Sequence, residues 1–70
     1  MSIQLVTGAT GLLGSHLVEL LCKRGQRVRA LVRPGADTRF LVQHGVEIVW
    51  GDLTRPETLL PACRGVTVVY

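Results

Sequence analysis

Three glycines placed three residues apart constrain the fold of this chain more than any other feature. Gly8, Gly11 and Gly14 follow the aliphatic run 3–7, where the helical pattern of residues 12–24 begins. Gly8 allows a tight turn out of a strand, Gly11 lets the backbone approach a ligand without an intervening Cβ, and Gly14 lets the helix lie close against the sheet. The free amides and positive dipole end of such a helix favour phosphate groups. The sequence therefore predicts a phosphate-binding turn between a strand and a helix.

Short aliphatic runs alternate with helical patterns along the whole chain. The predicted strands cover residues 3–7, 27–33, 46–50 and 66–70. This alternation is typical of βαβ units in a parallel sheet, and right-handed crossovers order the strands 3-2-1-4. We therefore expect an α/β fold with a truncated, Rossmann-type parallel sheet, helices on both faces and an open edge on the fourth strand. The alternative for the glycine motif is an ordinary tight turn, but the flanking strand and helix favour phosphate binding.

Two further helices are predicted after the second and third strands. Asp37 is expected to cap a helix over residues 38–44. Thr54 and Glu57 have the spacing of a capping box, which predicts a helix start at Thr54. Pro61 lacks the amide that an interior helical residue donates, so this helix should kink or end within about two turns.

Composition excludes several classes of protein. With 70 residues, 47% of them hydrophobic, the chain is expected to form one small globular unit. It has no apolar run of the roughly 20 residues that a membrane span needs, and no signal-type leader follows Met1, which predicts a cytoplasmic protein. The arginines behind the net charge of +3 are dispersed, so we expect no nucleic-acid partner. Cys22 and Cys63 lack metal-ligand spacing, and no metal site is expected.

The segment from Thr7 to Leu17, TGATGLLGSHL, resembles the TGATGxxGxxL signature of the short-chain dehydrogenase/reductases. The similarity is to the extended and atypical branches, which include NAD-dependent epimerase/dehydratase proteins, dihydroflavonol-reductase-like enzymes and NmrA-like proteins, and it extends to Tyr70. The resemblance implies that this chain is the N-terminal part, residues 1–70, of an NAD(P)-binding domain. It also implies cofactor contacts from one segment of the motif: Gly8, Thr10, Gly11, Leu12, Leu13 and Gly14.

The end of the second strand bears on the choice between NADP and NAD. Val32 occupies the position where NAD-binding members of the family usually carry Asp, and Arg33 comes next. An arginine there pairs with the 2′-phosphate of NADP, so we expect NADP as the cofactor, with NAD possible. The alternative is that Arg33 is a solvated loop residue, and Arg39 is a weaker candidate for the same contact.

Asp52 and Leu53 follow the third strand and are similar to the Asp-Leu or Asp-Val pair that contacts the adenine ring in the family. The resemblance therefore implies that both are cofactor-binding residues. The alternative for Asp52 is a carboxylate that only caps its own loop.

The residues that carry out catalysis in the family have no counterpart here. The family's acid is a tyrosine four residues before a lysine, whereas Tyr70 is the only tyrosine and reads as a strand residue. His16 and His44 read as helix-surface residues. The resemblance implies the cofactor-binding portion of an oxidoreductase, epimerase or dehydratase that acts on a sugar nucleotide or a ketone, inactive without its missing part. The alternatives are a non-catalytic, NADP-sensing module of the NmrA-like type and a scaffold; a homodimer is possible for the full-length protein.

Overall fold

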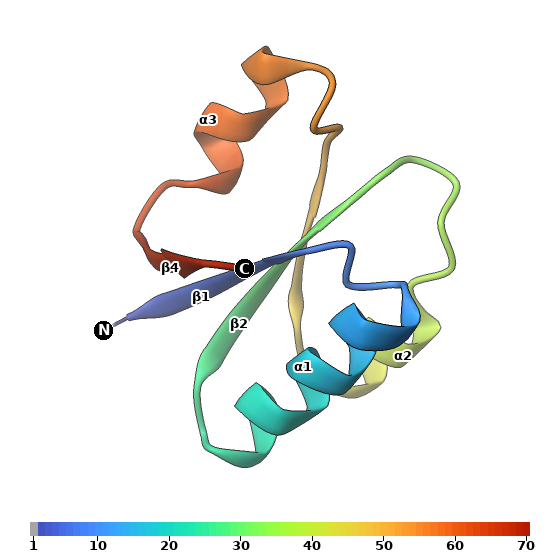
Figure 1. Ribbon diagram of the computed structural model, residues 1–70, viewed down its shortest axis with the longest axis vertical. Coiled ribbons are helices and arrows are strands. Elements are labelled where there is room, and N and C mark those ends of the chain that lie inside the picture. Colours follow the sequence, from blue (N-terminus) through green and yellow to red (C-terminus); the bar gives the residue numbers. More distant parts are fainter. Residues whose placement is uncertain (1) are drawn as a thin grey trace.

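The computed structural model describes residues 2–70, so Met1 lies outside the description. Strands and helices alternate as the sequence predicts (Figure 1). The elements are β1 (Ile3–Thr7), α1 (Leu12–Lys23), β2 (Arg27–Val32), α2 (Arg39–Gln43), β3 (Glu47–Trp50), a 3-10 turn (Pro56–Thr58), α3 (Leu59–Ala62) and β4 (Val66–Val69). Every predicted strand is present, and the strand ends differ from prediction by one residue at most.

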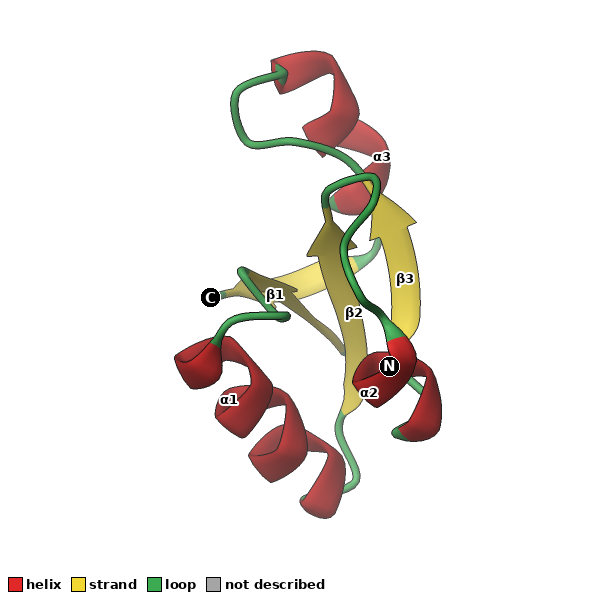
Figure 2. Ribbon diagram, turned by 90° about the vertical axis from the view of Figure 1, so that its right-hand side faces the viewer, coloured by secondary structure: helices red, strands yellow, loops and turns green. Residues whose placement is uncertain are grey.

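The four strands form one parallel sheet in the order β3-β2-β1-β4. Figure 2 shows β2 and β3 running side by side in the same direction. This order confirms the prediction from right-handed crossovers. The carboxyl ends of β1, β2 and β3 therefore come together at one end of the sheet, where Thr7, Val32 and Trp50 each end a strand.

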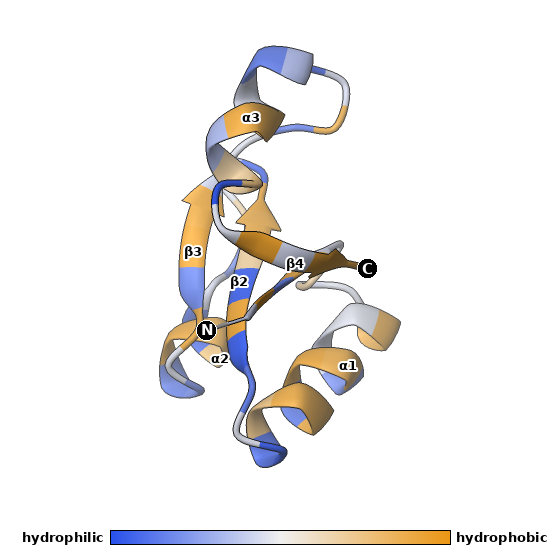
Figure 3. Ribbon diagram, turned by 90° about the vertical axis from the view of Figure 1, so that its left-hand side faces the viewer, coloured by the Kyte–Doolittle hydropathy of each residue, from blue (hydrophilic) through white to orange (hydrophobic). Residues whose placement is uncertain are grey.

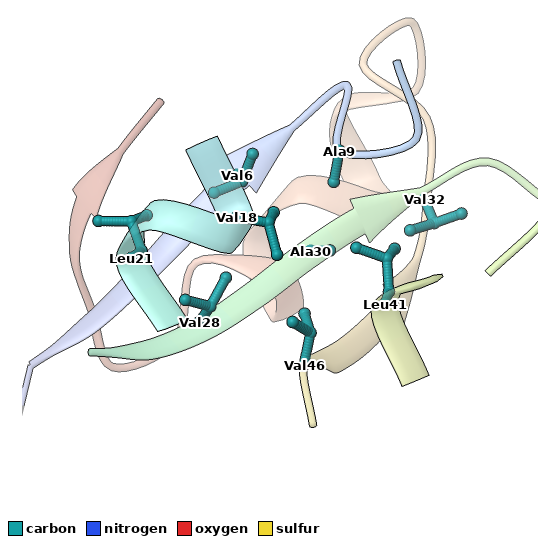
Figure 4. Packing of buried hydrophobic residues seen from close by; sticks show 9 residues of the cluster. All are labelled: Val6, Ala9, Val18, Leu21, Val28, Ala30, Val32, Leu41 and Val46. Atoms are coloured by element: carbon teal, nitrogen blue, oxygen red, sulfur yellow. The ribbon is translucent and has the colours of Figure 1, made fainter. Parts of the chain in front are cut away.

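Two apolar clusters lie on opposite faces of this sheet because successive strand residues point in opposite directions. In β2, Val28, Ala30 and Val32 belong to the larger cluster, which α1 and α2 cover with Val18 and Leu41 (Figure 4). On the other face, α3 covers a smaller cluster of Leu5, Leu31 and Ala62. The prediction of helices on both faces is confirmed.

The outer side of β4 has no partner strand within residues 2–70. Figure 3 shows the end of β4 as strongly hydrophobic, and Val69 and Tyr70 are exposed. The predicted open edge is present at this strand.

The segment after β3 differs from the predicted capping box. Thr54 does not begin a helix: its amide donates to the Asp52 carboxylate over 2.9 Å, and its hydroxyl donates to the same oxygen over 2.8 Å. Helical geometry starts instead at Pro56, with Arg55 at the cap position and no side-chain cap. The predicted capping box is wrong because the amide and hydroxyl of Thr54 donate to the carboxylate of Asp52, two residues upstream, instead of capping a helix. The helix ends one residue after Pro61, as predicted.

The predicted cap of the second helix holds in part. The Asp37 carboxylate accepts the backbone amide of Arg39 over 3.1 Å. Thr38 occupies the cap position, without a side-chain hydrogen bond of its own, and α2 covers only Arg39–Gln43. Asp37 therefore satisfies one free amide of a helix shorter than the predicted 38–44.

Candidate functional site

The glycine motif forms a tight turn between β1 and α1. Gly8 leaves the strand with φ at +64°, a left-handed conformation that favours glycine. Its carbonyl accepts the amide of Gly11 over 3.0 Å and closes the turn. The carbonyl of Gly11 then accepts the amide of Ser15 over 2.9 Å, which begins α1. Residues 8–11 thus connect the strand directly to the helix, as the motif predicts.

Gly14 has no room for a side chain. A Cβ at this position would lie 2.9 Å from the Cα of Ala9 and would also meet the backbone of Gly8. Gly14 therefore permits close packing, as predicted, but the first turn of α1 packs on the glycine turn itself rather than on the flat part of the sheet.

Gly11 differs from the other two glycines because the fold of the chain does not require it. Its φ of −80° and ψ of 173° are extended values that any residue adopts. A Cβ there would meet only the Gly8 carbonyl oxygen, at an ordinary contact distance of 3.4 Å. Gly11 is also exposed. The turn therefore presents bare backbone to the outside at this point without any structural need for it.

The first amides of α1 have no hydrogen-bond acceptor in the described part of the chain. Within residues 2–70, no carbonyl or side chain accepts a hydrogen bond from the amides of Leu12, Leu13 or Gly14. No acidic side chain lies in the first turn to offset the helix dipole. The amide of Gly11 already donates to Gly8, so the amides that remain for a ligand begin at Leu12. The side chains of Leu12 and Leu13 are 75% and 84% exposed.

A cavity of about 380 Å³ opens at the carboxyl ends of β1, β2 and β3. It brings together five of the nine predicted cofactor-binding residues, and Gly11, Leu12, Leu13 and Gly14 are not part of its lining. In open parallel sheets, ligands bind outside the carboxyl ends of the strands. The lining residues are Thr7, Gly8, Thr10, Leu31, Val32, Arg33, Ala36, Gly51, Asp52, Leu53 and Thr54.

A second cavity of about 550 Å³ lies between the glycine turn and α2. It shares Thr10 and Ala36 with the first cavity, so the two adjoin along the β2–α2 loop. Its other lining residues are Ala9, Ser15, Asp37, Phe40 and Leu41. Sequence reasoning missed this cavity because its walls come from a turn and a helix that only the fold brings together.

The two candidate arginines have different surroundings. Arg33 is exposed in the lining of the first cavity, and its guanidinium has no ion pair among the described residues. Arg39 holds the Asp37 carboxylate through Nη2 at 2.7 Å and Nε at 3.1 Å. Of the two candidates, Arg39 is therefore already paired with a carboxylate, whereas Arg33 is not paired among the described residues.

Asp52 shapes its own loop as well as lining the cavity. Its Oδ1 accepts both hydrogen bonds from Thr54, and these bonds, helped by the charges of Arg33 and Arg55, hold the pKa of the carboxyl below its ordinary value. Thr58 also secures this loop, with its hydroxyl 3.0 Å from the amide of Asp52. Sequence reasoning missed the roles of Thr54 and Thr58, although an Asp two residues before a Thr is a signal for such a turn.

The described part of the chain contains neither a cluster of metal-ligating side chains nor a membrane-spanning helix. Residues 2–70 contain no group of three or more His, Cys, Asp or Glu that could hold a metal ion. Within the same residues, no helix combines the length and the apolar character needed to cross a membrane.

Two curated proteins resemble the chain over almost all of its length. It is 48% identical over 69 residues to the photosystem II assembly factor Ycf39 of Cyanophora paradoxa. The aligned residues make up 99% of this chain and 21% of that protein. It is 44% identical over 66 residues to the NAD(P)H azoreductase of Xenophilus azovorans. The aligned residues make up 94% of this chain and 23% of that protein. The chain thus spans about a fifth of the length of the curated relatives it matches.

A solved structure and a family model agree with the fold. The structure of AtPrR2 with NADP+ and (+)pinoresinol superimposes with a TM-score of 0.84 at 30% identity, covering 97% of this chain and 24% of that one. The model of the NmrA-like family matches residues 2–70. With this match across the parallel sheet and the glycine turn, the chain belongs to the NmrA-like family.

Proposed function

We propose that the chain binds the diphosphate of a nicotinamide dinucleotide at the start of α1. The observation that carries the proposal is the exposed backbone of Gly11, followed by three amides, at Leu12, Leu13 and Gly14, that have no acceptor among residues 2–70. Backbone amides at a helix N-terminus, together with the helix dipole, suit a diphosphate. In this proposal a side chain at Gly11 would obstruct the ligand. Ligand binding therefore explains a glycine that the fold does not require.

The adenosine end of the cofactor is proposed to occupy the 380 Å³ cavity. Asp52 and Leu53 line this cavity and are proposed to contact the adenine ring, and Arg33 lines it where the second strand ends. Because the Arg33 guanidinium has no ion pair within residues 2–70, it is available to the 2′-phosphate, which favours NADP(H) over NAD(H). The NADP+ bound to AtPrR2 supports the same cofactor class.

In the whole protein we infer an NAD(P)-dependent oxidoreductase or epimerase, with a sugar nucleotide or a ketone as substrate. The similarity to NAD(P)H azoreductase supports the reductase class. The 70 residues contain no Tyr-x-x-x-Lys, so in this proposal they hold the cofactor and residues outside them carry out proton transfer.

A second candidate is a protein that binds the dinucleotide without turning over a substrate. The similarity to a photosystem II assembly factor favours this candidate, since that name describes assembly and not a reaction. Both candidates use the same cofactor site. Turnover of NADPH with a panel of ketones and azo compounds by the complete protein separates them.

Binding of NADP+ and NAD+ to the complete protein tests the cofactor proposal, followed by calorimetry or by the fluorescence of Trp50. Arg33→Ala should weaken NADP+ about tenfold or more, because it removes a charge-assisted contact, and should change NAD+ binding little. Arg27→Ala is the matched control, since it removes an exposed arginine at the opposite end of the same strand. Failure of the wild type to bind either dinucleotide would refute the proposal, and an unchanged preference in Arg33→Ala would refute the role of Arg33.

A further inference from the structure

An ion pair closes the β2–α2 loop beside the candidate site. The Asp37 carboxylate accepts Arg39 Nη2 over 2.7 Å and Arg39 Nε over 3.1 Å, and it also accepts the Arg39 backbone amide. The Arg39 side chain is 91% exposed and that of Asp37 is 62% exposed. The guanidinium is thus held by its neighbour two residues away while it is otherwise surrounded by solvent.

The carboxylate of this pair belongs to a cavity wall. Asp37 lines the second cavity, and Thr10 and Ala36 line both cavities. Figure 1 shows α2 beside α1, and Asp37 lines the second cavity together with Ala9 and Thr10 of the glycine turn. Arg33 lines the first cavity on the same loop. The Asp37 carboxylate and the Arg33 guanidinium therefore border the space where the loop meets the turn, and Arg39, which lines neither cavity, is bound to Asp37.

We propose that Asp37 is a specificity-determining residue that weakens the preference for NADP(H) by keeping Arg39 from the 2′-phosphate. This inference rests on the proposed cofactor function. It assigns Asp37 a role that no motif in the sequence indicates, because the family resemblance places the preference at the end of the second strand.

The charge balance supports this assignment. With the ion pair intact, a 2′-phosphate near Thr10 and Ala36 meets the charge of Arg33 and a pair whose charges cancel. Without the Asp37 carboxylate, the same phosphate meets two cations. At ordinary ionic strength, charges closer together than the screening length of about 8–10 Å interact appreciably. NAD(H) has a hydroxyl in place of the phosphate, so its affinity depends little on the pair.

Two substitutions test the proposal in the complete protein. Asp37→Asn keeps an oxygen that can accept the Arg39 amide but removes the charge that holds the guanidinium. It should tighten NADP+ about three- to tenfold while NAD+ changes less than about twofold. Arg39→Gln leaves the Asp37 carboxylate uncompensated and should weaken NADP+ by a similar factor. The tightening in Asp37→Asn should shrink when salt is raised from about 0.05 M to about 0.5 M, because the contact is exposed.

Glu57→Gln is the matched control, since Glu57 forms a comparable exposed pair with Arg55 at 3.8 Å and lines neither cavity. It should leave both affinities unchanged. The proposal is overturned if Asp37→Asn binds NADP+ no more tightly relative to NAD+, which is the outcome expected if Asp37 only caps α2. Absence of binding of either dinucleotide by the wild type would instead refute the cofactor function on which the inference rests.

Discussion

A Cβ added to Gly14 would lie 2.7 Å from the carbonyl carbon of Gly8, so α1 and the glycine turn touch through bare backbone. Both groups are backbone, and neither can move aside as the end of a flexible side chain would. Gly14→Ala should therefore lower the free energy of unfolding by about 2 kcal/mol, despite the better helix propensity of alanine. Urea denaturation measures the change, and a mutant as stable as the wild type would contradict this close approach.

Gly11→Ala should have the opposite profile. The extended backbone at Gly11 accepts a side chain, so stability should change by no more than about 0.5 kcal/mol. Dinucleotide affinity should fall at least about tenfold, because the methyl group would stand between the backbone and the diphosphate. Calorimetric titration alongside urea denaturation checks both expectations. Loss of stability with intact affinity would show that Gly11 is there for the fold.

Arg29 should be important for the position of α3. This buried guanidinium donates to the carbonyl oxygens of Ala62 over 2.8 Å and Arg64 over 2.6 Å, and its Nε donates to Glu47 over 3.0 Å. Arg29→Met would leave these carbonyls without a donor and should cost about 1–3 kcal/mol. In this variant, the amides of α3 should lose their protection from hydrogen exchange before those of the other elements.

Glu47→Gln is the control for this prediction, since it keeps the arginine and alters a half-exposed partner. It should cost less than about 1 kcal/mol. Equal losses in the two variants would mean that the carboxylate, and not the pair of carbonyls, holds Arg29.

The stability of the protein should depend on Asp37 in acid. The hydrogen bonds from Arg39 lower the pKa of this carboxyl from 3.8 to about 2. A lowered pKa means that the folded state favours the ionised form, so the contribution is complete above pH 3.8 and is lost as the pH falls towards about 2. The difference in urea midpoint between the wild type and Asp37→Asn should narrow over that range. A constant difference would contradict the role of the charge.

The parts of the fold that could be predicted from the sequence are those set by local pattern. The glycine spacing, the leucines of α1 and the aliphatic runs specify a strand, a turn and a helix within a few residues of one another. The strand order then follows from the handedness of the crossovers. The hydrogen bond from the Gly11 amide to the Gly8 carbonyl was not predicted. It closes the turn, and the glycine spacing in the sequence does not reveal it.

The features that could not be predicted depend on residues far apart in the chain. The carbonyls that hold Arg29 lie more than thirty positions downstream, so nothing near it in the sequence explains why a charged residue is buried in β2. The joint position of Arg33, Asp37 and Thr10 likewise exists only once β2 and the turn are side by side.

The most direct test is amide NMR of the complete protein during titration with NADP+. The amide signals of Leu12, Leu13 and Gly14 should shift strongly as hydrogen bonds to the diphosphate form, while the signal of Gly45, just beyond the far end of α2, should not. If NADP+ binds and those three amides keep their free-state shifts, the diphosphate does not bind at the N-terminus of α1.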